Sequence, residues 1–171
     1  MDKYVMIALF FLAGALTTRG QIRCDIPAFL YDEDPKGTNV RSGPGSTFEI
    51  IGVLPREETD TVQITASGPS WAQISEAFDE DGETIFSKKG WVFASLLGMT
   101  ISANPYDKFK KGYQNLYAEP NKKSRVLGRL LPDTSVLLVS CDGTWAKVRS
   151  GRTIGWIPRE AQCTNSRTTC S

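Results

Sequence analysis

The sequence contains no histidine, the side chain that most often acts as a general base. Ser-His-Asp and Cys-His arrangements for nucleophilic hydrolysis are therefore excluded. Neither GxGxxG nor GxxxxGK[ST] occurs, so no phosphate-binding loop is indicated. The 19 acidic residues offer many carboxylate pairs, but the small domains predicted below leave little room for the sugar cleft of a glycosidase. We expect a protein that is not an enzyme, with no catalytic residues and no cofactor.

The run DEDGE, Asp79–Glu83, is the densest group of carboxylates. Oxygen ligands in a turn suit Ca²⁺, but Asp-x-Asp-Gly is only a fragment of a calcium loop and lacks the distant bidentate Glu. We favour a solvated hairpin tip with Gly82 at the bend, flanked by Phe78 and Phe86, and expect no metal site. Calcium binding by residues 78–87 stays open.

Four cysteines, an even number, favour disulfides if the chain enters an oxidising compartment. They are Cys24, Cys141, Cys163 and Cys170. Three connectivities exist. We favour Cys163–Cys170 as a clip near the C-terminus and Cys24–Cys141 as a brace between the halves; Cys141–Cys163 is nearly as well supported.

Residues 1–20 are typical of a signal peptide. Lys3 precedes an apolar run from Val5 to Leu16 that is too short to span a bilayer comfortably. Thr18 and Gly20 suit cleavage before Gln21. We expect export to the periplasm or the extracellular space and no membrane association after cleavage. With 20 basic and 19 acidic residues, no strong field of one sign favours nucleic acid.

The rest of the chain contains an internal repeat. Asn39-Val40 aligns with Asn115-Leu116 at an offset of 76, and Pro44 then falls on Pro120. Each copy continues with Gly and Leu-Pro, a β-rich run, a turn before Trp, and Gly-Trp with an aliphatic residue. The chain thus contains two copies of one unit of about 60 to 75 residues, residues 25–98 and 113–162, with a linker at 99–112 and a Cys-containing tail at 163–171.

Short segments of alternating polarity predict strands in both units. We expect Val62, Ile64, Trp71 and Ile74 on inner faces, and Gly52 at a bulge or close approach. In the second unit the expected core comprises Val126, Leu127, Leu130, Val136, Leu138, Val148 and Ile157. Helix is limited to single turns at 94–97 and 158–161. Gly43 and Gly45 suit positive φ after the first core strand, as does Asn121 in the second copy.

The motif Asn-Val-Arg-Ser-Gly-Pro-Gly, Ile-Gly-x-Leu-Pro, Trp, and Gly-Trp-Val-x-x-Ser-x-Leu resembles the bacterial SH3 (SH3b) domain family. The match covers residues 37–97; residues 113–161 match less closely. The resemblance implies an all-β fold of two tandem small SH3-like β-barrels. Members of this family are mostly exported and often direct a partner enzyme to cell-wall peptidoglycan, or bind other ligands.

Exposed aromatic residues near the loops of such barrels are candidates for holding peptides or sugars. In the first unit they are Tyr31, Phe48 and Trp91, with Arg41 available for a carboxylate; in the second they are Tyr113, Tyr117 and Trp156. A core role for the tryptophans and a surface salt bridge for Arg41 remain alternatives. We expect a monomeric binding module for peptidoglycan peptide or glycan, or alternatively an adaptor or accessory subunit for a cell-envelope protein.

Overall fold

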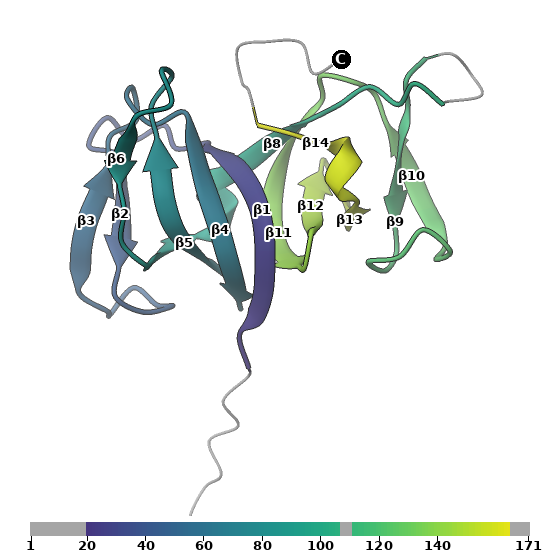
Figure 1. The fold of residues 1–171 in the computed structure, drawn as a ribbon. Helices are drawn as coiled ribbons and strands as arrows, with labels where there is room; N and C mark the ends of the chain where they lie inside the picture. The colour runs from purple at the N-terminus through teal and green to yellow at the C-terminus, as the bar shows by residue number, and fades with distance from the viewer. Residues whose placement is uncertain (1–19, 107–110, 165–171) are drawn as a thin grey trace, which may run out of the picture.

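The computed structural model describes residues 20–106 and 111–164. The first half contains β1 (Ile22–Leu30), β2 (Thr38–Arg41), β3 (Ile50–Leu54), β4 (Thr61–Gly68), β5 (Trp71–Phe78), β6 (Thr84–Phe86), β7 (Gly90–Phe93), the 3-10 turn η1 (Ala94–Leu96) and β8 (Leu97–Ile101). The second contains β9 (Gln114–Tyr117), β10 (Val126–Leu130), β11 (Ser135–Asp142), β12 (Trp145–Ser150), β13 (Thr153–Ile157), η2 (Arg159–Ala161) and β14 (Gln162–Cys163). The all-β prediction is confirmed, and both expected single turns are present (Figure 1).

The predicted repeat is visible in the strands. β2, β3, β4, β5 and β7 correspond in order to β9, β10, β11, β12 and β13. Burial follows the repeat as well. Both β3 and β10 begin with four exposed or half-buried residues and end on a buried leucine. The insertion in the first unit forms the predicted hairpin, in which β6 pairs with the end of β5.

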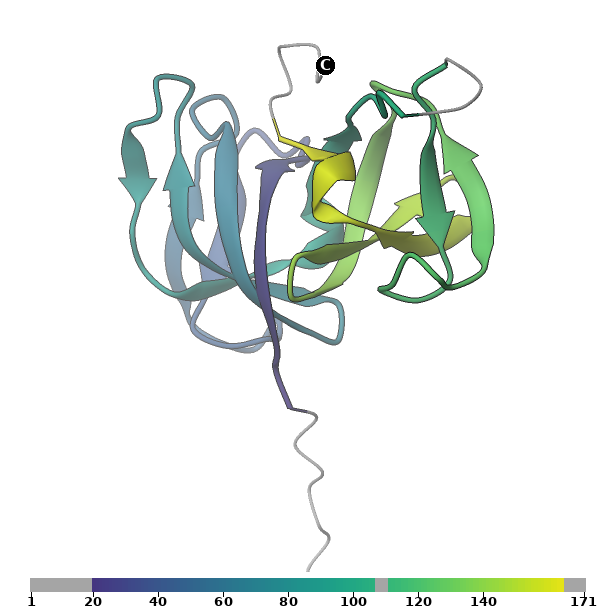
Figure 2. The same cartoon turned by 45° about the vertical axis from the view of Figure 1, so that its right-hand side comes forward.

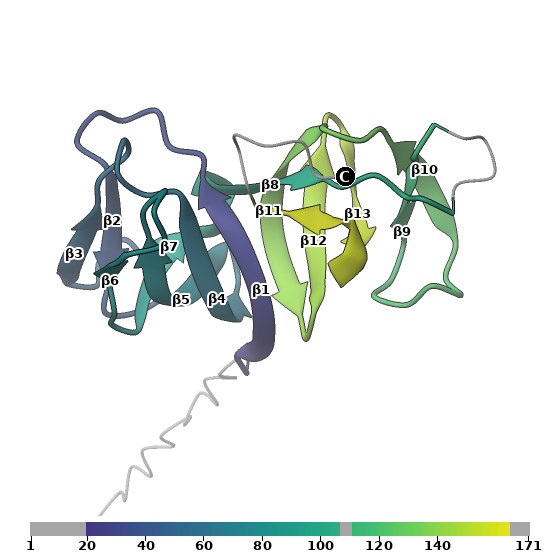
Figure 3. The same cartoon turned by 45° about the horizontal axis from the view of Figure 1, so that its top comes forward.

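The two units share one strand. β1 pairs with β4 on one side and with β8 on the other. β8 in turn pairs with β11 of the second unit, and β14 also pairs with β8. β8 thus ends the first unit and opens the second, and all described strands join one sheet, ordered β10, β9, β13, β12, β11, β8, β1, β4, β5, β7, β2, β3 (Figure 3). Residues 99–101, which we assigned to a linker, lie in this strand.

The sheet encloses apolar side chains from both units in one contiguous cluster. Val62 and Ile64 are fully buried, as predicted, but Trp71 is not. Because side chains alternate along a strand, Ile74 shares its inward face with Ala72, and Trp71 lies on the outer face. Val126 is 45% exposed instead of buried, because β10 is the end strand of the sheet and has a neighbour on one side only.

The turns after β2 and β9 use a different geometry from the expected one. Within the described residues, neither Gly43, Gly45 nor Asn121 has a positive φ. Gly43 is required by a close approach instead, since a Cβ there would lie 2.4 Å from the Phe48 ring. Asn121 accepts a hydrogen bond from the Lys123 N–H at 2.9 Å, an Asx turn that needs no left-handed residue. Gly52 lies at a register shift and under Phe86, as predicted.

A disulfide links Cys24 on β1 to Cys141 on β11, with 5.8 Å between the Cα atoms. The predicted brace between the halves is confirmed, and the alternative Cys141–Cys163 pairing is wrong. Across the same junction, the Asp25 N–H donates to the Gly143 carbonyl at 2.8 Å and the Gly143 N–H donates to the Arg23 carbonyl at 2.9 Å. β1 lies between the two units (Figure 2). Cys163 is also disulfide-bonded; Cys170, the partner we favoured for it, lies outside the described residues.

Residues 1–19, most of the predicted signal peptide, also lie outside the described residues. In the part of the chain that the structure describes, no helix has the length and apolar character needed to cross a membrane.

Candidate functional site

A groove opens on the first unit between the loop at 31–37, β2 and the end of β7. Its volume is about 660 Å³. We call it the first groove; it is lined by Asp32, Asp34, Gly37, Asn39, Arg41, Gly45, Ser46, Trp71, Phe93 and Leu96. It therefore combines aromatic surface with charges of both signs.

The aromatic surface is formed by Trp71 at the start of β5 and Phe93 at the end of β7. These residues are paired across the two strands, so their side chains lie on the same outer face. Their rings meet edge to face at 5.6 Å and 71°. Trp71 is half-buried and Phe93 is 42% exposed, so a flat surface remains accessible to a ligand.

The acidic wall of the first groove is held by hydrogen bonds within its loop. Asp32 accepts from the Thr38 hydroxyl at 2.6 Å and from the Asp34 N–H at 3.0 Å. Asp34 accepts from the Lys36 N–H at 2.9 Å. Gly37 has φ +78, and a Cβ there would lie 2.3 Å from the Leu54 carbonyl oxygen. The loop is thus held by hydrogen bonds within its own sequence, and its two carboxylates give this wall of the groove a negative charge.

Arg41 supplies the positive charge of the first groove. Its Nη1 donates to the backbone carbonyl of Phe48 at 2.8 Å, and its backbone pairs with Trp91 on β7. One arm of the guanidinium is therefore anchored while the side chain still lines the groove. A guanidinium held in this way suits a carboxylate, which it can bind through two N–H groups.

A second groove, of about 360 Å³, lies at the equivalent place on the second unit. It is lined by Ala103, Asn104, Pro105, Tyr106, Gln114, Asn115, Tyr117, Lys122, Pro158 and Glu160. Asn115 and Tyr117 take the positions of Asn39 and Arg41, so the arginine is replaced by a phenol. The second groove therefore lacks the guanidinium of the first.

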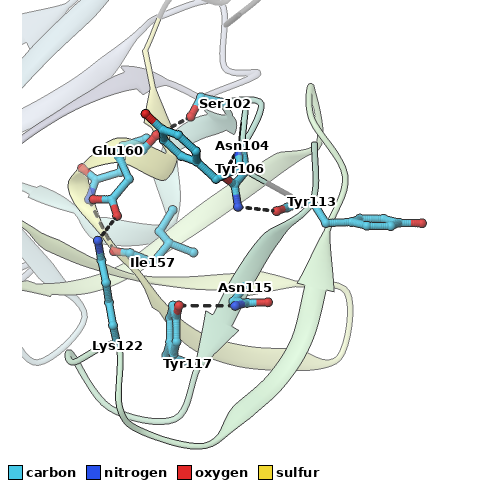
Figure 4. A network of polar contacts seen from close by, with 10 residues as sticks. Ser102, Asn104, Tyr106, Tyr113, Asn115, Tyr117, Lys122, Ile157 and Glu160 are labelled. Carbon is cyan, nitrogen blue, oxygen red and sulfur yellow. Dashed lines mark hydrogen bonds and ion pairs between the residues drawn. The ribbon is translucent and has the colours of Figure 1, made fainter. Parts of the chain in front are cut away.

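Side-chain amides organise the second groove (Figure 4). Asn104 donates to the Tyr113 carbonyl at 3.1 Å and accepts from the Tyr106 N–H at 3.0 Å. Asn115 donates to the Tyr117 hydroxyl at 3.3 Å. Tyr106 is 92% exposed. The second groove thus presents phenols and amides where the first presents Trp71 and Arg41.

Lys122 and Glu160 form an ion pair at the side of the second groove (Figure 4). The hydrogen bond to Glu160, followed by its charge, raises the pKa of the Lys122 ammonium. Partial burial raises the pKa of Glu160, but the hydrogen bond and charge of Lys122 outweigh it, and the pKa of this carboxyl lies below its ordinary value. Both side chains are more than half exposed, so the pair contributes under about 1 kcal/mol.

The Glu160→Gln variant should lose part of this contribution in a pH-dependent way. Because the pKa of Glu160 is lower in the folded state, the carboxylate stabilises the fold at pH values above its unfolded pKa, near 4.5. This stabilisation is lost as the pH falls through the pKa of the folded state. The raised pKa of Lys122 stabilises the folded state at pH values below its ordinary pKa of 10.5. The ion pair therefore stabilises the fold at neutral pH. Urea unfolding should show a loss of roughly 0.5 kcal/mol at pH 7 and a smaller loss at pH 3. An equal loss at both pH values would contradict this account.

The structure places two of the seven residues predicted to bind ligand in the grooves, Arg41 in the first and Tyr117 in the second. Tyr31 and Phe48 are exposed but line neither groove. Tyr113 and Trp156 are half-buried and also lie outside the linings; Lys147 lies over the Trp156 ring at 5.5 Å.

Trp91 requires a correction, because it is only 3% exposed. It lies on β7 between the outward Arg41 and Gln73, with which it is paired, and Gly68 lies beside its ring, since a Cβ there would be 3.7 Å from it. A ligand therefore has no access to its face, and Trp91 acts as a packing residue.

The sequence interpretation missed Trp71 and Phe93 as site residues. The expected inner-face position of Trp71 is wrong, and Phe93 carries no prediction. The available signal was the alternation itself: buried Val92 forces Phe93 outward, and inward Ala72 and Ile74 force Trp71 outward.

The acidic hairpin is organised around one carboxylate. Asp79 accepts from the N–H groups of Asp81 and Glu83 at 3.0 and 2.8 Å, and Gly82 has φ +82 at the bend. Across residues 20–106 and 111–164, no group of three or more Asp, Glu, Cys or His side chains is placed to hold a metal ion.

Comparison with protein families resolves the repeat into domains. A model described as bacterial SH3 domain matches residues 36–98, and a second model of the same description matches residues 110–161. The chain is a tandem of two bacterial SH3 domains. The first SH3b domain thus contains the first groove, and the second SH3b domain contains the second groove.

Two solved structures from Trichomonas vaginalis are similar to the tandem. NlpC2 is 13% identical with a TM-score of 0.31, over 81% of this chain and 47% of its own. NlpC1 is 15% identical with a TM-score of 0.32, over 89% of this chain and 50% of its own. The chain thus spans about half the length of these proteins. No curated protein matches it.

Proposed function

We propose that the protein is an exported, non-catalytic binding module whose SH3b domains recognise peptidoglycan, with a stem peptide in the first groove. The observation that supports this most is that Arg41, Asp32 and Asp34 line the same groove as the Trp71–Phe93 surface. Stem peptides combine carboxylates with a free amine on the diamino acid. A groove with both charges and a flat apolar surface suits such a ligand better than it suits a neutral glycan.

Export is supported by the residue pattern of positions 1–20 and by the Cys24–Cys141 disulfide. Disulfides persist in the periplasm and outside the cell and are rare in the reducing cytosol. The absence of histidine, which is a property of the whole sequence, favours binding without catalysis.

Co-sedimentation with purified sacculi tests the proposal. The wild type should pellet with the sacculi, and Trp71→Ala should weaken binding at least about tenfold, the effect expected for removing an aromatic anchor. Ile22→Ala is the control, because Ile22 is an exposed apolar residue at the start of β1, outside the groove lining, and it should pellet like the wild type. Wild-type protein that stays in the supernatant, under conditions in which a known wall binder pellets, would refute the proposal.

The second candidate is an adaptor that binds a cell-envelope protein through the hairpin at 78–87. It is favoured by the position of β6, which pairs with β5 alone at a sheet edge, and by Ile85, which is 36% exposed there. A pull-down from envelope extract distinguishes the two functions. Recovery of one protein by the wild type, abolished by shortening the hairpin and unaffected by Trp71→Ala, would favour the adaptor.

A further inference from the structure

A small pocket at the junction of the two domains adjoins the first groove. Its volume is about 170 Å³, and its lining includes Ser70, Phe93, Ser95, Leu137 and Arg149. Phe93 lines both this junction pocket and the first groove. Ser70 directly precedes Trp71 of the groove, and the Ala94 N–H binds the Ser70 carbonyl at 2.9 Å. The two hollows are therefore neighbours that share one aromatic wall.

The far wall of the junction pocket belongs to the second domain. Arg149 on β12 is paired with Leu137 on β11, and Leu137 is paired with Gly98 on the shared strand. Two strand spacings, roughly 10 Å, therefore separate the backbones of Arg149 and Gly98. Because Val148 is fully buried, Arg149 points outward, on the side of Leu137. The shared strand β8 and the Cys24–Cys141 disulfide fix this wall against the first domain.

The polar groups of the junction pocket suit an anion. Arg149 is its charged residue, and the exposed side chains of Ser70 and Ser95 add two hydroxyls. Within the described residues Arg149 forms no ion pair, and the Ser70 and Ser95 hydroxyls have no side-chain hydrogen bond. A guanidinium flanked by hydroxyls can bind a carboxylate through two N–H groups, and the apolar wall beside it can pack against the rest of a peptide.

We infer that an extended peptide leaves the first groove over Phe93 and places a carboxylate at Arg149. The inference rests on the proposed function and extends it: the second domain supplies a specificity residue for a ligand held mainly by the first. The ligand class is a peptide with at least two carboxylates, one for Arg41 and one for Arg149. A stem pentapeptide spans about 16 Å when extended, and Phe93 and Arg149, the residues it must connect, line the same small pocket.

The test compares a synthetic stem pentapeptide that has a free terminal carboxylate with the same peptide as its terminal amide, by isothermal calorimetry on the whole protein. Wild type should bind the carboxylate form several-fold more tightly. Arg149→Ala should weaken the carboxylate form about five- to tenfold and leave the amide unchanged. Arg152→Ala is the matched control, an exposed arginine in the turn after β12, and should bind both peptides like the wild type.

Three results would overturn the inference. If Arg149→Ala binds both peptides like the wild type while Trp71→Ala binds neither, the ligand stays within the first groove and the proposed function stands. If Arg149→Ala and Arg152→Ala weaken binding equally, the effect is general charge attraction. If the wild type binds neither peptide at millimolar concentration, the inference and the stem-peptide assignment both fail. Equal melting temperatures of the variants establish that each is folded.

Discussion

Replacing both Cys24 and Cys141 by alanine should lower the free energy of unfolding by about 4 to 5 kcal/mol. The bridge joins residues 117 positions apart in the sequence. A cross-link over such a loop lowers the conformational entropy of the unfolded chain by an amount of this size. A domain of this kind is typically stable by about 5–15 kcal/mol, so the variant should be marginal at 37 °C. Urea unfolding followed by tryptophan fluorescence measures the change.

The single variants provide the control for the disulfide. Cys24→Ala and Cys141→Ala each break the same bond, so each should lose nearly as much stability as the double variant, and their effects should not add. Additive losses would show that packing of the two side chains, which are 9% and 0% exposed, dominates over the cross-link.

The Met99→Asp variant should unfold both domains together. Met99 is fully buried in β8, in register with Val136 of the second domain, and β8 also completes the first domain through β1. An ionised carboxylate there costs several kcal/mol in addition to the lost side chain, so a total loss above about 5 kcal/mol is expected. Hydrogen exchange should show protection lost in β5 and β12 alike.

Thr100→Asp is the matched control for the shared strand. Thr100 neighbours Met99 but is half-buried on the opposite face, so its substitution should leave protection in both domains largely intact. Protection that persists in β5 while β12 of Met99→Asp exchanges freely would contradict the coupling, because it would mean that the first domain folds without β8.

The repeat was predictable because its signals are local. Gly-Trp with an aliphatic residue, Asn before an aliphatic residue and the Pro after it occur in both copies, and each corresponds to a strand or turn. The shared strand was not predictable in this way. The apolar and polar residues of Met99-Thr100-Ile101 alternate as in a strand. However, three such residues followed by Asn104-Pro105 and a lysine-rich stretch are equally typical of a linker between domains. Only their pairing with β11 and β14, which are distant in sequence, identifies these residues as sheet: Met99 pairs with Val136, and Ile101 pairs with Gln162.

The grooves were only partly predictable. Arg41 and Tyr117 follow from Val40 and Leu116, whose burial forces the next side chain outward. Trp91 follows the same rule and also points outward, yet it is covered. Trp91 is buried because residues on adjacent strands surround it: Gly68 lies beside its ring, and Arg41 and Gln73 flank it. The alternation within one strand does not encode these contacts. Exposure of an outward aromatic residue therefore depends on the residues beside it on adjacent strands.

The shared strand also has a consequence for avidity. Two domains on a flexible tether meet paired ligands at many separations, and bivalent binding then costs the entropy of ordering the tether. Here the spacing between the grooves is set by hydrogen-bonded strands and a covalent bridge. For a ligand that occupies both grooves, we expect a large gain in avidity only when its repeat spacing matches this fixed separation.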